Sequence, residues 1–120
     1  MTSRIATIAV DAAQPEVVAE FWCQVLGWHV LERDDEMVSI GPDDGSGPGM
    51  DVIAVPEGKV VKNRLHLDLR ADGTTTQQEL DRLLALGARR TDVGQGPDVS
   101  WVVLADPEGN EFCVLDRREQ

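Results

Sequence analysis

The sequence predicts an α+β domain made of two βαβββ modules. An order of strand, helix and three strands occurs twice, and the two halves match at an offset of about sixty residues. The length of 120 residues also suits one ordinary domain. We therefore expect a single domain over residues 1–120, with modules at about 4–56 and 63–117. Their sheets are expected to be mostly antiparallel and to curve around a cavity, with the helices on the outer face.

The first module is predicted to begin with a strand at residues 5–10, IATIAV, in which apolar side chains alternate weakly. A helix follows, because Pro15 suits a first helical turn and apolar residues recur at helical spacing from Val18 to Val25. Gly27 is expected to end this helix in the left-handed conformation. Three short strands complete the module, with the sequences WHVLER, MVSIG and MDVIAV, and the polar residues DDE are predicted to form the turn between the first two.

The second module repeats this order. Its first strand is predicted at residues 64–69, RLHLDL, which alternates strictly and has one polar face, formed by Arg64, His66 and Asp68. Thr76 and Glu79 have the spacing of a capping box at the start of the second helix, and Gly87 is expected to end that helix. The segments SWVVLA and EFCVLD are the last two predicted strands of this module and are joined by the turn DPEGN.

Composition excludes several classes of partner. The chain has 22 acidic residues against 11 Lys and Arg, and its formal net charge of −11 repels nucleic acid and anionic lipid alike. No apolar run approaches the length of a membrane span, and the N-terminus lacks the pattern of a signal peptide, so a cytoplasmic location is expected. The two cysteines, Cys23 and Cys113, are too few and too far apart for a disulfide framework, and we expect reduced thiols.

The doubled unit, the segment PEVVAEFWCQVLGW, the strand RLHLDL and the terminal WVVLADPEGNEFCVL together resemble the vicinal oxygen chelate superfamily, in particular its glyoxalase-like and bleomycin-resistance-like members. The resemblance covers nearly the whole chain. It implies a cavity formed by the curved sheets. In catalytic members of the superfamily, four side chains hold a divalent metal there, one each from the first and last strands of the two modules.

Matching that pattern residue by residue places Thr7 and His66 on the first strands and Ile53 and Cys113 on the last strands. Among the four, only His66 is a good metal ligand, because Cys113 is a possible one, Thr7 is weak and Ile53 has no donor atom. We expect Cys113 to be a buried structural cysteine and not a reactive thiol. We therefore expect these four residues and Trp101, which alternation places on the cavity side, to line a pocket.

If the last strands were aligned with the family pattern two residues differently, every side chain would stay on the same face of its sheet. Asp51 and Glu111 would then stand in place of Ile53 and Cys113. His66 with Asp51 and Glu111 would then be a plausible ligand set. Asp68 lies on the same face as His66, and we expect it to influence the protonation of His66 without orienting the imidazole directly.

Two functions follow from the resemblance. The favoured one is a glyoxalase-like binding protein that sequesters a small molecule, as bleomycin-resistance proteins do, with no cofactor favoured. The alternative is a metal-dependent lyase, isomerase or dioxygenase that uses His66 with Glu111, Asp51 or Cys113. The expected partners are a small-molecule ligand and a second copy of the chain, because family members pair and a free sheet edge needs covering. The acidic charge favours a cationic ligand, and the indole of Trp101 could stack on a planar or cationic one.

Overall fold

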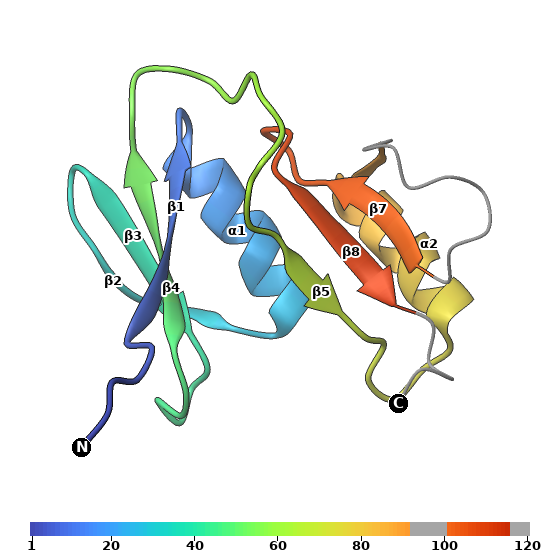
Figure 1. Ribbon diagram of the computed structural model, residues 1–120, viewed down its shortest axis with the longest axis horizontal. Helices are drawn as coiled ribbons and strands as arrows, with labels where there is room; N and C mark the ends of the chain where they lie inside the picture. The colour runs from blue at the N-terminus through green and yellow to red at the C-terminus, as the bar shows by residue number, and fades with distance from the viewer. Residues whose placement is uncertain (92–100, 116–120) are drawn as a thin grey trace. The chain divides into compact units, whose positions relative to one another are not determined.

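The computed structural model describes residues 1–91 and 101–115, and it divides the chain into two units, Met1–Gly58 and Lys59–Gln120 (Figure 1). In the part of the chain that is described, each unit has one helix and one four-stranded mixed sheet. The α+β architecture of two βαβββ modules is thereby confirmed. The predicted strand ends at Ser100 and Asp116, and the predicted module end near residue 117, lie outside the described residues.

The first unit has its strands in the spatial order β1-β4-β3-β2. β1 pairs with β4 in parallel, and the other two pairings are antiparallel. Helix α1 packs against β3 and β4 (Figure 1). The elements are β1 (Thr7–Ala12), α1 (Pro15–Leu26), β2 (His29–Arg33), β3 (Met37–Gly41) and β4 (Gly49–Ala54).

Strand alternation places the core of the first unit between its sheet and α1. On β3 and β4 one set of alternate residues is fully buried: Val38, Ile40, Met50 and Val52. Helix α1 contributes a matching apolar stripe of Val18, Ala19, Phe21, Trp22 and Val25. The opposite set of alternate residues occupies the open face of the sheet, which the helix does not cover.

The second unit has the same topology, with its strands in the order β5-β8-β7-β6. β5 and β8 are parallel neighbours, and Phe112, Val114 and Leu104 are buried, as is Leu83 of the helix. The elements are β5 (Leu67–Leu69), α2 (Thr76–Leu86), β6 (Arg89–Arg90), β7 (Trp101–Ala105) and β8 (Glu111–Leu115).

The first strand of each module differs from its prediction because its partner strand sets its length. β1 begins at Thr7 instead of residue 5, since its parallel partner β4 begins at Gly49, which is paired with Thr7. β5 contains only Leu67–Leu69 of the predicted residues 64–69. β8 begins at Glu111, so the residues before His66 face the preceding turn and have no strand to pair with, and Leu65 is 88% exposed.

Both helix ends fall beside glycine, as predicted, but the start of α2 differs by one residue. Gly27 has φ 68°, in the left-handed region, and ends α1. The capping box of α2 is formed by Thr75 and Gln78, not by Thr76 and Glu79. The Thr75 hydroxyl accepts a hydrogen bond from the backbone N–H of Gln78 (3.1 Å), and Thr76 is the first helical residue.

Neither helix that the structure describes has the length and apolar composition needed to cross a membrane.

Candidate functional site

Three potential metal ligands lie together on the open face of the second unit. Asp68 on β5 pairs directly with Cys113 on β8, so their side chains project from the same face of the sheet. His66, just before β5, follows the same alternation and brings its Nε2 within 3.1 Å of Oδ1 of Asp68. One donor atom from each of His66, Asp68 and Cys113 lies within 4.8 Å of the other two.

The expectation that Asp68 does not orient His66 directly was therefore wrong. Strand alternation had placed both side chains on one face, but it did not indicate that the imidazole of His66, free of the strand, turns toward the neighbouring carboxylate. The side chains of His66 and Asp68 are 43% and 51% exposed, whereas Cys113 is buried.

The thiol of Cys113 is not an activated nucleophile. Burial raises its pKa, and the carboxylate of Asp68 raises it further through charge repulsion and a hydrogen bond, while Lys62 opposes this with a smaller effect. In a catalytic Cys–His pair the imidazole contacts the thiol and the carboxylate lies behind it. Here the carboxylate contacts both other groups, which disfavours nucleophilic catalysis and leaves coordination of a cation as the chemistry that this cluster suits.

Glu111 lies on the same face of β8 but is already bound within the unit. Its carboxylate accepts a hydrogen bond from Nζ of Lys59 (2.7 Å) and one from the backbone N–H of Asn63 (2.8 Å). Both side chains of the ion pair are largely buried, with 15% of Lys59 and 14% of Glu111 exposed. Burial by itself would raise the pKa of Glu111, but the hydrogen bonds from Lys59 and Asn63, with the charge of Lys59, outweigh it and lower that pKa. We refer to Lys59, Asn63 and Glu111 as the Glu111 clasp.

The remaining residues proposed from the sequence divide between the two units. Thr7, Asp51 and Ile53 belong to the open face of the first unit, where Thr7 Oγ1 donates to the carbonyl of Gly49 (3.3 Å) and Asp51 accepts from Ser39 Oγ (2.6 Å). Trp101 is 37% exposed and lies opposite Leu115 on the second sheet. Alternation along β7 puts Trp101 on the same face as Cys113.

The strand pairing in the structure aligns the first strands of the two modules differently from the sequence match. Asp11 pairs with Ile53 in the first unit, and Asp68 pairs with Cys113 in the second. With Ile53 and Cys113 equivalent, the counterpart of His66 on β1 is Ala9, two residues beyond Thr7. The first unit therefore has a carboxylate at this place but neither an imidazole nor a thiol.

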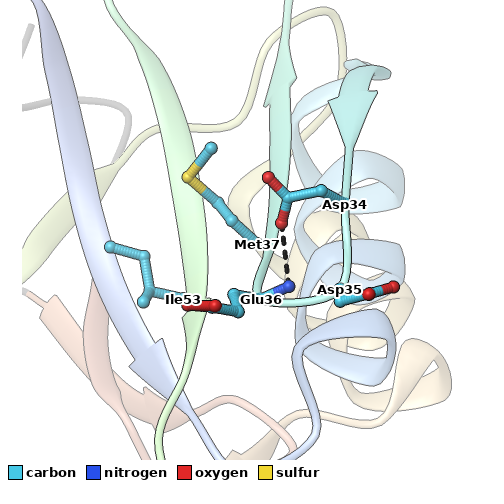
Figure 2. A pocket seen from close by; sticks show the side chains of 5 residues that line it. All are labelled: Asp34, Asp35, Glu36, Met37 and Ile53. Atoms are coloured by element: carbon cyan, nitrogen blue, oxygen red, sulfur yellow. Dashed lines mark hydrogen bonds between the residues drawn. The ribbon is translucent and has the colours of Figure 1, made fainter.

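A hollow of about 440 Å³ lies at the β2–β3 turn of the first unit and is lined by Asp34, Asp35, Glu36, Met37 and Ile53 (Figure 2). Met37 and Ile53 face each other across β3 and β4, and their side chains point to the same side of the sheet. The turn is held by a hydrogen bond from the Glu36 backbone N–H to Oδ1 of Asp34 (2.8 Å). The hollow thus combines an apolar wall with an acidic rim.

Sequence reasoning missed part of both features. It recognised DDE as a turn but did not connect that turn with Ile53, because the two are far apart in the sequence and meet only through the β3–β4 register. It also left Lys59 and Asn63 unassigned. The signal available for Lys59 was weak, since Lys62 and Arg64 lie close to it in the sequence and each of these cations has many acidic residues to pair with in a chain of this composition.

Comparison with known proteins gives a consistent picture of the fold. A family model described as a glyoxalase-like domain matches residues 7–115. No curated protein sequence matches the chain.

Solved structures of similar fold span nearly the whole chain. One is a glyoxalase/bleomycin resistance protein/dioxygenase family enzyme from Burkholderia phytofirmans PsJN, with a TM-score of 0.72 and 16% identity over 95% of this chain and 98% of that one. The fosfomycin resistance protein FosX from Listeria monocytogenes has a TM-score of 0.73 and 11% identity over 96% and 91% of the two chains. TnmS3, an antibiotic binding protein from Streptomyces sp. CB03234, has a TM-score of 0.64 and 18% identity over 96% of each chain. At these identities the likeness concerns the fold.

Proposed function

This chain belongs to the family of glyoxalase-like domains, and we propose that it binds and sequesters a small organic cation without converting it. The observation that carries the proposal is the hollow of the first unit, in which the apolar side chains of Met37 and Ile53 lie beside the acidic turn of residues 34–36. An apolar wall with a few charged groups at its rim is the usual composition of a small-molecule site. Solved structures of the same fold include an antibiotic binding protein, which is consistent with this role.

The residues do not fit the four-ligand metal centre of catalytic relatives. Ile53 and Ala9, the first unit's counterparts of Cys113 and His66 in the strand register, have no side-chain donor atoms. Thr7, which the sequence match placed there instead, donates its hydroxyl to a backbone carbonyl. Glu111 is held by the clasp, and Asp51 by Ser39. These residues therefore do not support a catalytic step through a metal shared by the two modules.

The chemistry of the hollow defines the class of ligand. Three consecutive carboxylates, in a chain of net charge −11, produce a negative potential that attracts cations and speeds their encounter. Met37 and Ile53 offer dispersion contacts to an apolar or aromatic body. A compact aromatic or aliphatic group that bears an ammonium or guanidinium fits both requirements.

A pair of probes that differ in charge alone tests this proposal. Phenyltrimethylammonium and its uncharged isostere tert-butylbenzene would be titrated against the protein and followed by chemical-shift changes of the Ile53 and Met37 methyl groups. We expect the cation to bind at least several-fold more tightly and to weaken with added salt, because exposed charges are screened. Mass spectrometry is expected to recover the bound probe unchanged.

Matched variants distinguish the hollow from general acidity. Glu36→Gln removes one rim charge and Ile53→Ala removes part of the apolar wall, and each is expected to weaken binding of the cation. Asp81→Gln, on the helix of the other unit, removes the same formal charge and should leave the affinity unchanged. Equal affinity for the two probes, or equal loss in the Asp81 variant, would contradict the proposal.

A further inference from the structure

The cluster of His66, Asp68 and Cys113 lies in the second unit, whereas the hollow proposed for the ligand lies in the first. The cluster is formed by two neighbouring parallel strands and the residue just before one of them. Its three donor atoms, an imidazole nitrogen, a carboxylate oxygen and a sulfur, lie within 4.8 Å of one another. Nothing in the proposed binding function requires this arrangement.

The separation of the donors is close to that of a metal site. A tetrahedral zinc ion with bonds of about 2.0–2.3 Å places its ligand atoms roughly 3.3–3.8 Å apart. The half-exposed side chains of His66 and Asp68 have room to close the remaining distance, and Cys113 is fixed on the buried side. Nε2 of His66 and Oδ1 of Asp68 already lie 3.1 Å apart, close to the separation of two ligands on one metal.

The chemistry of the donor set selects the kind of metal. A thiolate and an imidazole favour zinc and neighbouring transition metals, whereas magnesium and calcium prefer oxygen ligands only. On binding, the thiol proton leaves to solvent and the sulfur binds the metal as a thiolate. One thiolate and one carboxylate then balance the two charges of the cation.

The geometry points to a three-ligand site for a zinc-like divalent cation, formed by His66, Asp68 and Cys113 within the second unit. The site differs from the family's four-ligand centre because both modules contribute to that centre, whereas this site takes all its protein ligands from one. Asp68 supplies the third donor from within the same unit. The fourth coordination position remains open to water or a small anion.

Titration of the full-length chain with cobalt(II), used as a spectroscopic substitute for zinc, tests the site. Protein freed of metal by dialysis against a chelator and kept reduced is expected to bind one cobalt per chain and to develop a sulfur-to-cobalt charge-transfer band. Zinc should abolish the band by displacing cobalt. Loss of any one ligand should weaken zinc binding by more than the roughly 10–100-fold that loss of an outer-shell contact costs.

The chain supplies a matched control for each ligand. His66→Ala, Asp68→Asn and Cys113→Ser are expected to lose the site. His29→Ala and Cys23→Ser alter the other histidine and the other cysteine, and Asp11→Asn alters the register equivalent of Asp68. These three are expected to bind cobalt as the unaltered protein does.

Asp68→Asn is the decisive variant, because its side chain is half-exposed and circular dichroism can show that the fold is kept. Failure of cobalt and zinc to bind the unaltered protein would overturn the inference. So would binding that persists in the Asp68 variant, or binding that depends equally on the control residues. Because the metal alone is the probe, these results do not depend on whether the organic cation binds to the first unit.

Discussion

The carboxylate of Asp106 is fully buried and organises the turn between β7 and β8. Its Oδ1 accepts hydrogen bonds from the backbone N–H groups of Glu108 and Asn110, both at 2.9 Å, and its Oδ2 accepts from the side chain of Asn110 at 3.0 Å. The turn that the sequence marked with proline and glycine is therefore also held by a buried acid. A buried donor that loses its partner costs free energy, which makes this residue a stability determinant.

Asp106→Ala is expected to lower the free energy of unfolding by about 2–3 kcal/mol, because it leaves two backbone donors without their acceptor. Asp106→Asn keeps an acceptor oxygen at the same place and should lose less. Urea denaturation followed by tryptophan fluorescence measures both values. Equal stability of the alanine variant and the unaltered protein would show that water replaces the carboxylate at no cost.

The Glu111 clasp makes stability depend on pH in a definite direction. The pKa of Glu111 is lower in the folded state than its ordinary value of 4.5, so the unfolded chain binds this proton more readily. The clasp therefore contributes stability above that ordinary pKa. The contribution is lost as pH falls through the lower pKa of the folded state.

Glu111→Gln should remove this part of the acid dependence and flatten the stability curve below about pH 4.5. The same substitution at Glu57, which is exposed, serves as the control. Thermal unfolding measured at several pH values from neutral to acid compares the two. An unchanged slope in the Glu111 variant would show that other carboxylates account for the loss of stability in acid.

At the scale of elements, the start of α2 illustrates two sequence patterns that compete at neighbouring positions. Thr75 with Gln78 and Thr76 with Glu79 both have capping-box spacing, and the structure uses the first pair. Thr75 has extended backbone angles, φ −82° and ψ 160°, as an N-cap residue requires. Glu79, whose side chain is largely buried, instead forms an ion pair with Arg82 one turn further along the helix.

Alanine substitution shows which of the two threonines caps the helix. Thr75→Ala is expected to destabilise the protein by about 1 kcal/mol, because the backbone N–H of Gln78 loses its acceptor. Thr76→Ala, at the first helical position, should change stability by a few tenths of a kcal/mol at most, since alanine has the higher helix propensity. Chemical denaturation of the two variants decides between the boundaries, and a larger loss for Thr76 would contradict the observed cap.

At the scale of the whole molecule, we propose that the chain forms a homodimer. β2 is an edge strand whose five residues are all exposed, and Val30 and Leu31 are 39% and 56% exposed. Open sheet edges with apolar side chains favour pairing with another chain. Multi-angle light scattering should then give twice the chain mass of 13.1 kDa.

Leu31→Lys places a charge on that edge and is expected to shift the light-scattering mass toward the monomer. Val17→Lys, which adds the same charge at an exposed position on α1, is the control. A monomeric mass for the unaltered protein at high concentration would reject the proposed dimer. A mass that falls equally in both variants would point to charge in general rather than to the β2 edge.

The sequence by itself determined the order of elements, the ends of the helices at Gly27 and Gly87, and the α+β class. These features depend on local backbone preference and on the periodicity of apolar residues, which neighbouring residues alone can show. Alternation also placed Ile53 and Cys113 on the faces opposite the helices.

Only the tertiary structure decided how distant segments meet. The pairing of Asp68 with Cys113 made a cluster from residues far apart in the sequence, and the β3–β4 register placed Ile53 beside the acidic turn. Lys59 and Asn63 bound Glu111 and removed it from the set of available ligands. Strand register is set by hydrogen bonds and packing between segments that are not neighbours in the chain. The alternation of side chains along a strand repeats every two residues, so a register shifted by two residues fits the sequence pattern equally well.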